Sequence, residues 1–258
     1  MSLFKKSVRH VLNSVVLILI GLLLHSCGSS DGSDIKTDNP ESAYMIAKSR
    51  YDKKDYYDAI DDFNLIKLKF SGSNIIDKAI YYLGMSYYKQ EEYILAIYEF
   101  ETMIKNYPTS PLSEDSRYML AMCYYKLSPE YYLDQTYTGY ALREFQNFID
   151  LHPNSKYKSD IEKRMRQLMN KLAYKTLKNA EMYYNLGNYK SAIVYYDNVL
   201  EEYFESDYAD DALYGKIQSL ISKKNYSEAR KEIERFEKRF PGSEFKGKVF
   251  SLKSNLPG

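Results

Sequence analysis

Apolar residues recur along most of this chain at intervals of three and four, the spacing that places side chains on one face of an α-helix. The clearest case is a pair of neighbouring segments, Asp77–Lys89 and Tyr93–Asn106, in which apolar residues fall at i, i+3, i+4 and i+7. No segment shows the strict alternation of apolar and polar residues that marks a half-buried strand. The pattern therefore predicts an all-α protein built from consecutive pairs of helices.

The helix pairs repeat along the chain. Five alanines mark one position, with an aromatic residue or Ile four residues later and a serine fourteen residues later. The alanines are Ala59, Ala96, Ala141, Ala192 and Ala229, the residues four later are Phe63, Phe100, Phe145, Tyr196 and Ile233, and the serines are Ser73, Ser110, Ser155, Ser206 and Ser243. Because one helix pair cannot bury its own apolar face, such units must stack, which predicts a superhelical solenoid of five helix-turn-helix repeats.

The spacing of the alanines is 37, 45, 51 and 37 residues, so two units are longer than the others. The third unit contains an insertion, Ser128–Gly139, whose Pro and Gly predict a protruding loop that is available for contact. The following spacing contains an extension, Lys156–Thr176, which we expect to lengthen the helix that ends the third unit and to continue toward the fourth. The overlapping segment Lys156–Lys178 carries eight basic and two acidic residues. This composition fits either a solvated helix face or a basic face for an acidic partner or lipid headgroups.

The junctions between units carry helix stop and start signals, as in the stretch Lys105–Pro111. Pro108 is expected to end one helix, because it has no N–H and restricts the residue before it. Ser110 is expected to cap the next helix, with Pro111 in the first turn. All five units keep the serine, whereas only three keep the proline.

The N-terminus has the features of a bacterial export signal. A basic start precedes the apolar run Val11–Leu24, which is shorter than a typical transmembrane helix. Leu24–Cys27 resembles the lipobox of bacterial lipoproteins, although His25 departs from the usual small or apolar residue. The resemblance implies cleavage before Cys27 and lipidation of that residue, while an ordinary cleaved signal and an uncleaved anchor are the alternatives. The Gly-, Ser- and Asp-rich segment after Cys27 is predicted to be a flexible tether.

Composition and charge argue against several classes of function. The formal net charge of +1 gives no basic excess for binding nucleic acid. Cys27 and Cys123 are the two cysteines, and the second lies on an apolar helical pattern typical of a buried core position. His152 is the one histidine after the signal, so a His-based triad or metal site is hard to build. We therefore expect no catalytic residues, metal or cofactor.

The repeat resembles the tetratricopeptide repeat, whose consensus has a small residue, then Tyr, Ala, Phe and Pro in fixed order. In the second unit these positions are Gly84, Tyr87, Ala96, Phe100 and Pro108. A lipobox, a polar tether and five such repeats together resemble the BamD family of lipoproteins in the outer-membrane β-barrel assembly machinery. The closest local similarity is the segment Tyr132–Tyr157, with its Asp-Gln-Thr insertion.

The BamD resemblance implies a non-catalytic scaffold. Its partners would be unfolded outer-membrane proteins, bound by their targeting segments, together with the central barrel subunit, other accessory lipoproteins and the membrane through the lipid anchor. Gly28 after the lipidated cysteine favours the outer membrane, on its periplasmic face. Another periplasmic tetratricopeptide lipoprotein, which coordinates cell-wall synthesis or envelope constriction, is the second hypothesis. A helical muramidase-like enzyme is the third.

The same resemblance implies two sets of interaction residues. The first helix of each pair would line a concave groove, which gives six tyrosines for binding a peptide: Tyr44, Tyr51, Tyr81, Tyr88, Tyr118 and Tyr125. The alternative is that these rings stack on one another as part of the solvated structure. The last two units would contact the partner subunit through Tyr208, Tyr214, Arg235 and Arg239. The predicted organisation is a signal peptide (1–26), a lipidated tether (27–40), a peptide-binding half (41–155) and a partner-binding half (156–258).

Overall fold

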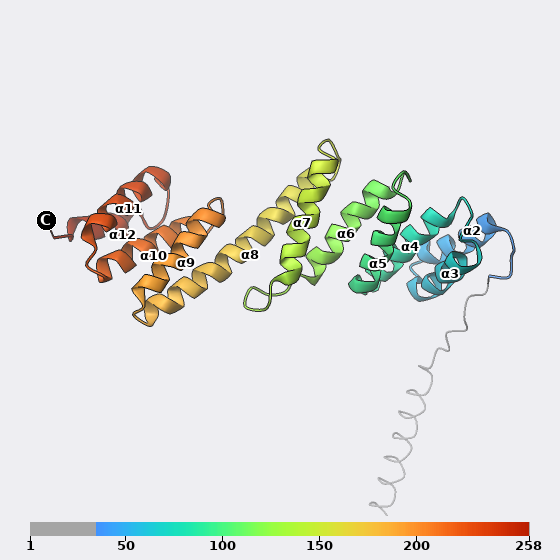
Figure 1. Ribbon diagram of the computed structural model, residues 1–258, viewed down its shortest axis with the longest axis horizontal. Coiled ribbons are helices and arrows are strands. Elements are labelled where there is room, and N and C mark those ends of the chain that lie inside the picture. Colours follow the sequence, from blue (N-terminus) through green and yellow to red (C-terminus); the bar gives the residue numbers. More distant parts are fainter. Residues whose placement is uncertain (1–34, 258) are drawn as a thin grey trace, which may run out of the picture. The chain divides into compact units, whose positions relative to one another are not determined.

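The computed structural model describes residues 35–257, and all its regular elements over this range are α-helices (Figure 1). The predicted signal peptide, the lipidation site Cys27 and most of the tether lie outside the described residues. The helices are α2 (Pro40–Asp52), α3 (Tyr56–Lys69), α4 (Ile76–Lys89), α5 (Tyr93–Asn106), α6 (Ser113–Leu127), α7 (Thr136–Leu151), α8 (Lys158–Asn185), α9 (Tyr189–Glu202), α10 (Ala209–Ser222), α11 (Tyr226–Arg239) and α12 (Lys246–Ser254).

The chain divides into two compact units, with the boundary inside α4 between Ser86 and Tyr87. In the first unit α2 packs against α3. In the second unit each helix packs against the next from α5 to α12, and α8 also contacts α10. The helices follow one another as five pairs, and α12 follows the last pair. The prediction of an all-α fold made of tetratricopeptide-like helix pairs is confirmed.

The residues that define the repeat form the core. All five repeat alanines have no exposed surface, and the aromatic or Ile side chain four residues later is at most 3% exposed. The side chains seven residues after the alanines are also buried, at most 1% exposed: Ile66, Met103, Phe148, Val199 and Phe236. Small residues allow two helices to approach closely, and large side chains one and two turns further along fill the space between them.

The second helix of every pair ends at the same repeat position. There an aromatic residue or His leaves helical geometry and its N–H donates to the carbonyl of the buried residue four positions earlier. These residues are Phe70, Tyr107, His152, Tyr203 and Phe240. A proline follows in three units, while Ser71 and Phe204 follow in the other two. The helix end therefore does not depend on the proline.

The serine that recurs in every unit lies in a turn and does not cap the next helix. The N–H of Ser110 donates to the carbonyl of Tyr107, and the carbonyl of Ser110 accepts from the N–H of Ser113. The hydroxyl of Ser110 accepts from the N–H of Leu112, which is itself the residue before α6. The prediction that Ser110 caps the helix, with Pro111 in its first turn, is wrong. Two consecutive turns place Ser110 three residues before Ser113, where α6 begins.

The expectation for the extension is also wrong. The helix of the third unit ends at Leu151, and α8 begins at Lys158 after a turn. α8 then runs without interruption for 28 residues to Asn185. The extension therefore lengthens the first helix of the fourth pair, since His152 and Ser155 form the same end and turn that separate the other units.

Candidate interaction surfaces

In the first unit, the predicted tyrosines pack around the ring of Tyr82, which is not among the residues predicted from the repeat. The ring centroid of Tyr82 on α4 lies 6.2 Å from that of Tyr44 and 5.1 Å from that of Tyr51, both on α2. The ammonium of Lys48 lies 4.7 Å from the Tyr82 centroid, and Tyr81 meets Tyr82 edge-on at 5.3 Å. Burial raises the pKa of both Tyr44 and Tyr51 to about 12. These rings form a half-buried aromatic seam between α2 and α4.

In the second unit, Tyr118 lies in a seam between α6 and α8. Its ring stacks on that of Tyr157, with centroids 4.0 Å apart and planes 7° from parallel. The Tyr118 hydroxyl donates to Asp160, and the Tyr157 hydroxyl donates in turn to Asp115. Burial, followed by the hydrogen bond to Asp160, raises the pKa of Tyr118 to about 12. The two crossed hydrogen bonds fix the positions of α6 and α8 relative to each other.

Tyr125 lies in the same seam, two helical turns after Tyr118 on α6. Its hydroxyl donates to Gln167 at 2.8 Å, and the guanidinium of Arg164 lies 4.9 Å from its ring centroid. Tyr88, at the end of α4, packs on Tyr93 at 5.4 Å, and burial raises the pKa of Tyr88 to about 12. The predicted tyrosines are therefore partly used for packing between helices, and each keeps part of its surface exposed. Peptide binding by these residues stays a prediction.

The insertion in the third unit lies against α8 and does not simply protrude. The ammonium of Lys171 donates to the hydroxyl of Ser128 and the carbonyl of Pro129, and that of Lys175 donates to the carbonyl of Leu133. The ring of Tyr131 meets that of Tyr174 on α8, with centroids 4.7 Å apart. Lysines of α8 satisfy carbonyls of the loop and hold its base, while Tyr132 and Leu133 of the loop stay exposed.

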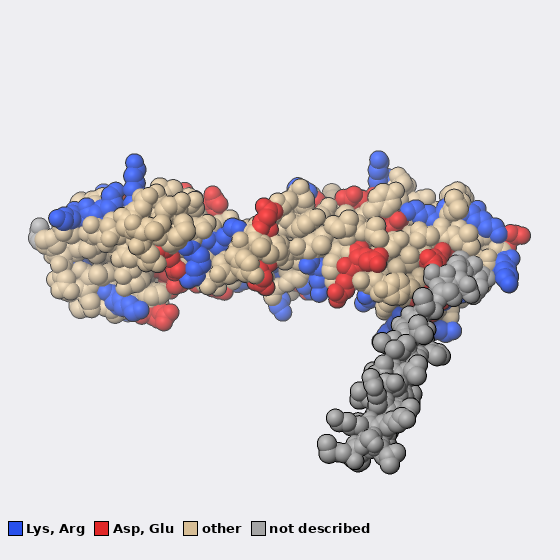
Figure 2. Space-filling view, turned by 90° about the horizontal axis from the view of Figure 1, so that it is seen from below, with Lys and Arg blue, Asp and Glu red and all other residues tan. Residues whose placement is uncertain are grey.

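The same contacts account for most of the basic residues that the sequence concentrates in Lys156–Lys178. Besides Lys171 and Lys175, Lys156 pairs with Asp115, Arg164 with Asp160 and Lys178 with Glu181. Figure 2 shows basic and acidic side chains interspersed with uncharged surface on the face that it presents. Five of the eight basic side chains thus bind within the unit, which favours a structural role for this segment over a continuous basic face.

The two predicted partner-binding tyrosines lie at the start of α10 and on it, and each packs against a ring from another helix or turn. The ring of Tyr208 lies 5.0 Å from that of Tyr174, and so continues the aromatic contacts of the insertion. The ring of Tyr214 stacks on Phe245 at 4.8 Å, next to the N-terminus of α12. Both rings are half-buried. Tyr214 lies on α10, the first helix of the fifth pair, and Tyr208 directly precedes that helix.

The two predicted arginines lie on α11 and have separate contacts. Arg235 donates to Glu232, one turn earlier on the same helix, at 3.3 Å. Arg239 donates to the carbonyl of Phe204 at 2.8 Å, and its guanidinium lies 5.9 Å from the Phe204 ring centroid. Arg239 therefore holds the turn between α9 and α10, a role that the sequence did not indicate. Binding of a partner by these four residues remains a prediction.

The structure also reveals buried acidic residues that the sequence reading missed. Asp62 has no exposed surface and pairs with Arg50 at 3.2 Å, and Glu232 is 7% exposed and pairs with Lys216 at 2.7 Å. Both acids come three residues after a repeat alanine, a position that is acidic in four of the five units: Asp62, Glu99, Glu144 and Glu232. This recurrence is the signal that could have identified them. Removing the cationic partner of a buried carboxylate would leave an unpaired buried charge, which destabilises the fold.

Residues that could carry chemistry have packing roles in the described part of the chain. Cys123 is buried, and burial raises the pKa of its thiol. His152 lies 5.1 Å from Phe148, ring to ring, at the end of α7. Across residues 35–257, no cluster of three or more His, Cys, Asp or Glu side chains has the arrangement of a metal site. None of the described helices combines the length and the apolar character needed to span a membrane.

A comparison with known protein families identifies the family of this chain. The family model YfiO, described as an outer membrane lipoprotein, matches residues 36–220. The chain belongs to this family. The match runs from the segment before α2 into α10, so it includes the first four helix pairs and most of the first helix of the fifth.

Solved structures with related helix pairs are more distant. The TPR2AB-domain:pHSP90 complex of yeast Sti1 is 12% identical, with a TM-score of 0.46, and the alignment covers 78% of each chain. A TPR repeats protein from Bacteroides fragilis NCTC 9343 is 15% identical, with a TM-score of 0.46, over 84% of this chain and 99% of that one. No curated protein sequence matches significantly. At these TM-scores the solved structures say nothing about the function of this chain.

Proposed function

We propose that this chain is a non-catalytic scaffold of the outer-membrane protein assembly machinery. In this proposal the chain is anchored through a lipid on Cys27 at the periplasmic face of the outer membrane. It binds targeting segments of unfolded β-barrel proteins and also binds the central barrel subunit, and so supports folding and insertion. The observation that carries the proposal is the match to a family of outer-membrane lipoproteins over most of the folded chain.

The partly exposed tyrosines on the first helices support the peptide-binding part of the proposal. A tyrosine ring offers apolar area with little conformational entropy to lose and a hydroxyl that can stay solvated. Such rings suit the extended, aromatic-rich segments that end β-barrel proteins. We assign the contact to the exposed edges of Tyr51 and Tyr81 in the first unit and of Tyr88 and Tyr125 in the second. The faces of these rings that already pack between helices are excluded from it.

Peptide affinity tests this assignment. A fluorescent peptide with the C-terminal strand of a β-barrel protein is titrated with the full chain and with two double variants, Tyr51→Ala/Tyr81→Ala and Tyr88→Ala/Tyr125→Ala. At least one double variant is expected to bind about tenfold more weakly, which corresponds to about 1.4 kcal/mol.

Exposed tyrosines elsewhere provide the matched controls. Tyr57 on α3 is 66% exposed and Tyr132 in the insertion is 67% exposed, so Tyr57→Ala and Tyr132→Ala should leave both affinity and stability unchanged. Circular dichroism of each double variant separates a lost contact from a lost fold. Unchanged affinity in both folded double variants would reject the tyrosine surface as the peptide site.

A further inference from the structure

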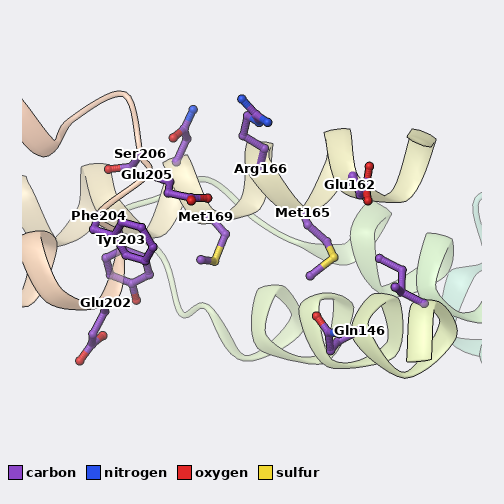
Figure 3. Close-up of a pocket in the computed structure, with 12 residues that line it drawn as sticks. Gln146, Glu162, Met165, Arg166, Met169, Glu202, Tyr203, Phe204, Glu205 and Ser206 are labelled. Atoms are coloured by element: carbon purple, nitrogen blue, oxygen red, sulfur yellow. The ribbon is translucent and has the colours of Figure 1, made fainter. Parts of the chain in front are cut away.

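The second unit contains a cleft that neither the tyrosine surfaces nor the predicted partner residues include. It has a volume of about 710 Å³ and lies along α8, between α7 on one side and the turn from α9 to α10 on the other. Figure 3 shows Met165 and Met169 pointing from α8 into this space, with Tyr203 and Phe204 at one end and Gln146 at the other. A volume of this size accommodates a few large side chains.

The cleft exists because α8 is longer than the first helix of an ordinary pair. The 51-residue spacing exceeds the basic 37 by fourteen residues, which is about 21 Å of helix. The core shared with α9 and α10 includes Ala173, Leu177 and Ala180 of α8 but not the residues nearer its N-terminus. The stretch of α8 that carries Met165 and Met169 thus lies between two helix pairs.

Two polar contacts hold the far wall of the cleft in place. The amide of Asn170 donates to the Asp207 carboxylate at 2.5 Å and accepts from the Asp207 N–H at 3.0 Å. Arg239 donates to the Phe204 carbonyl and covers the Phe204 ring. The turn that presents Tyr203 and Phe204 is therefore fixed to both α8 and α11, so the wall is formed before any partner binds.

Ser206, which lines this cleft, has an unsatisfied hydroxyl. At the equivalent junctions the serine hydroxyl donates to an acidic residue at the start of a first helix: Ser155 to Glu114 and Ser243 to Asp210, each at 2.6 Å. Ser206 Oγ is buried and has no hydrogen-bond partner among the described residues. The position equivalent to the acid is Ala173, inside α8, so this junction lacks the acceptor that the other two have.

The chemistry of the lining indicates what the cleft can hold. Its floor is apolar and adaptable because methionine side chains repack around ligands of different shape. Met169 is 37% exposed and Phe204 is 52% exposed, so both have surface to offer. The charged lining residues are three glutamates and one arginine: Glu162, Glu202, Glu205 and Arg166. The excess of negative charge favours a cationic partner.

We propose that this cleft is a docking site for a segment of a partner protein that carries a bulky apolar side chain flanked by Lys or Arg. The apolar side chain contacts Met165 and Met169, and the flanking cations face the glutamates. The cleft is separate from the tyrosine surfaces, so a test of docking in the cleft does not depend on peptide binding to those tyrosines.

Two synthetic peptides test the proposal on the full-length chain. One has a Leu-Phe-Leu core flanked by Lys and Arg, and the other has the same core flanked by Glu. Fluorescence anisotropy should show binding of the basic peptide and at least tenfold weaker binding of the acidic one. Met169→Lys should weaken binding of the basic peptide at least tenfold, because it places a cation in the floor. Met182→Lys, on the same helix at a site 48% exposed and outside the cleft, should not.

Two serine substitutions at equivalent junctions serve as controls for the fold. Ser206→Ala removes an unsatisfied buried hydroxyl without accessible surface, so the urea midpoint should stay unchanged or rise and binding of the basic peptide should stay unchanged. Ser155→Ala, whose hydroxyl is bonded to Glu114, should lower the urea midpoint and leave binding unchanged.

Three results would overturn the proposal: equal binding of the two peptides, binding of the basic peptide that Met169→Lys leaves unchanged, or the absence of binding. Analytical ultracentrifugation of the chain without peptide could give a fourth such result. A dimer that Met169→Lys dissociates would show that a second copy occupies the cleft.

Discussion

At the scale of single residues, the turns inside the helix pairs depend on left-handed backbone geometry. Lys54, Glu91, Gly187 and Lys224 have φ values of 68°, 63°, 74° and 62°. Each lies five residues before a repeat alanine, so four of the five pairs make the same turn. Only one of these residues is glycine, and side chains with a Cβ adopt this geometry at a cost. For this reason the turn could not be recognised from its residue types.

Gly187→Ala tests the importance of this geometry. We expect the free energy of unfolding to fall by about 1 kcal/mol, since the alanine Cβ is disfavoured at positive φ. A Cβ at Gly187 would meet nothing within 4 Å, so the loss would come from the backbone alone. Gly72→Ala is the matched control, because its surroundings are equally open and its φ is not positive. Urea denaturation should show a loss at Gly187 only, and equal effects at the two glycines would contradict the backbone explanation.

Asp211 should make the stability depend on pH. Burial, followed by the neighbouring Asp210 carboxylate, raises the pKa of Asp211 in the folded chain to about 6. The unfolded value is near 3.8, so the folded state binds more protons between these pH values. Stability from this group is present below about pH 4 and is lost as pH rises through about 6.

Asp211→Asn removes this dependence. We expect the variant to be more stable than the parent at pH 7, by on the order of 1 kcal/mol because solvent screens a partly exposed group, and to be equal to it at pH 4. Thermal unfolding of both proteins across this range measures the difference. A variant less stable than the parent at pH 7 would show that the ionised Asp211 carboxylate is favourable in the fold.

At the scale of elements, α8 and the insertion form the most distinctive part of the chain. Lys171 and Lys175 hold the insertion through carbonyl and hydroxyl groups, and Tyr131 packs on Tyr174. The loop is therefore held both by contacts with α8 and by its own hydrogen bonds, such as those that Gln135 donates to the carbonyls of Glu130 and Leu133. Its exposed tip, with Tyr132 and Leu133, projects from this fixed base.

Lys171→Met should release the insertion. The substitution keeps much of the apolar length of the side chain and removes the ammonium that bonds to Ser128 and Pro129. Amide hydrogen exchange in residues 128–135 is expected to become at least tenfold faster, while α8 itself keeps its protection. Lys158→Met, at the exposed start of α8, is the control and should leave the loop unchanged. Equal protection of the loop in parent and Lys171→Met would show that the remaining contacts hold it without Lys171.

At the scale of the whole chain, the repeat could be predicted because close helix contacts restrict residue type. The buried alanines and the large side chains that follow them are visible as spacing alone. The start of α8 was missed even though His152 and Ser155 repeat the ending found in every unit, because the basic segment after them contains no further break. The tyrosine positions followed from the helix register. Their partners Tyr82 and Tyr157 did not, because those contacts join different helices and depend on how the helices approach.

The cleft could not be predicted for a similar reason. Its floor and walls come from segments far apart in the sequence, and it forms only because the extension joins the first helix of the fourth pair. The sequence also does not reveal how the packing is adjusted within a single helix pair. Tyr196 replaces the Phe of earlier repeats, and a Cβ at Gly215 on α10 would come within 2.5 Å of its hydroxyl oxygen, so that glycine makes room for the larger ring.

The most direct test of the account is native purification of the full lipoprotein from its own outer membrane, followed by mass spectrometry. Belonging to a family of outer-membrane lipoproteins gives the location, and the proposed scaffold role adds a specific partner. The account predicts that the central barrel subunit of the assembly machinery is recovered in a near-stoichiometric amount. Recovery with a different envelope complex, and without that subunit, would contradict it.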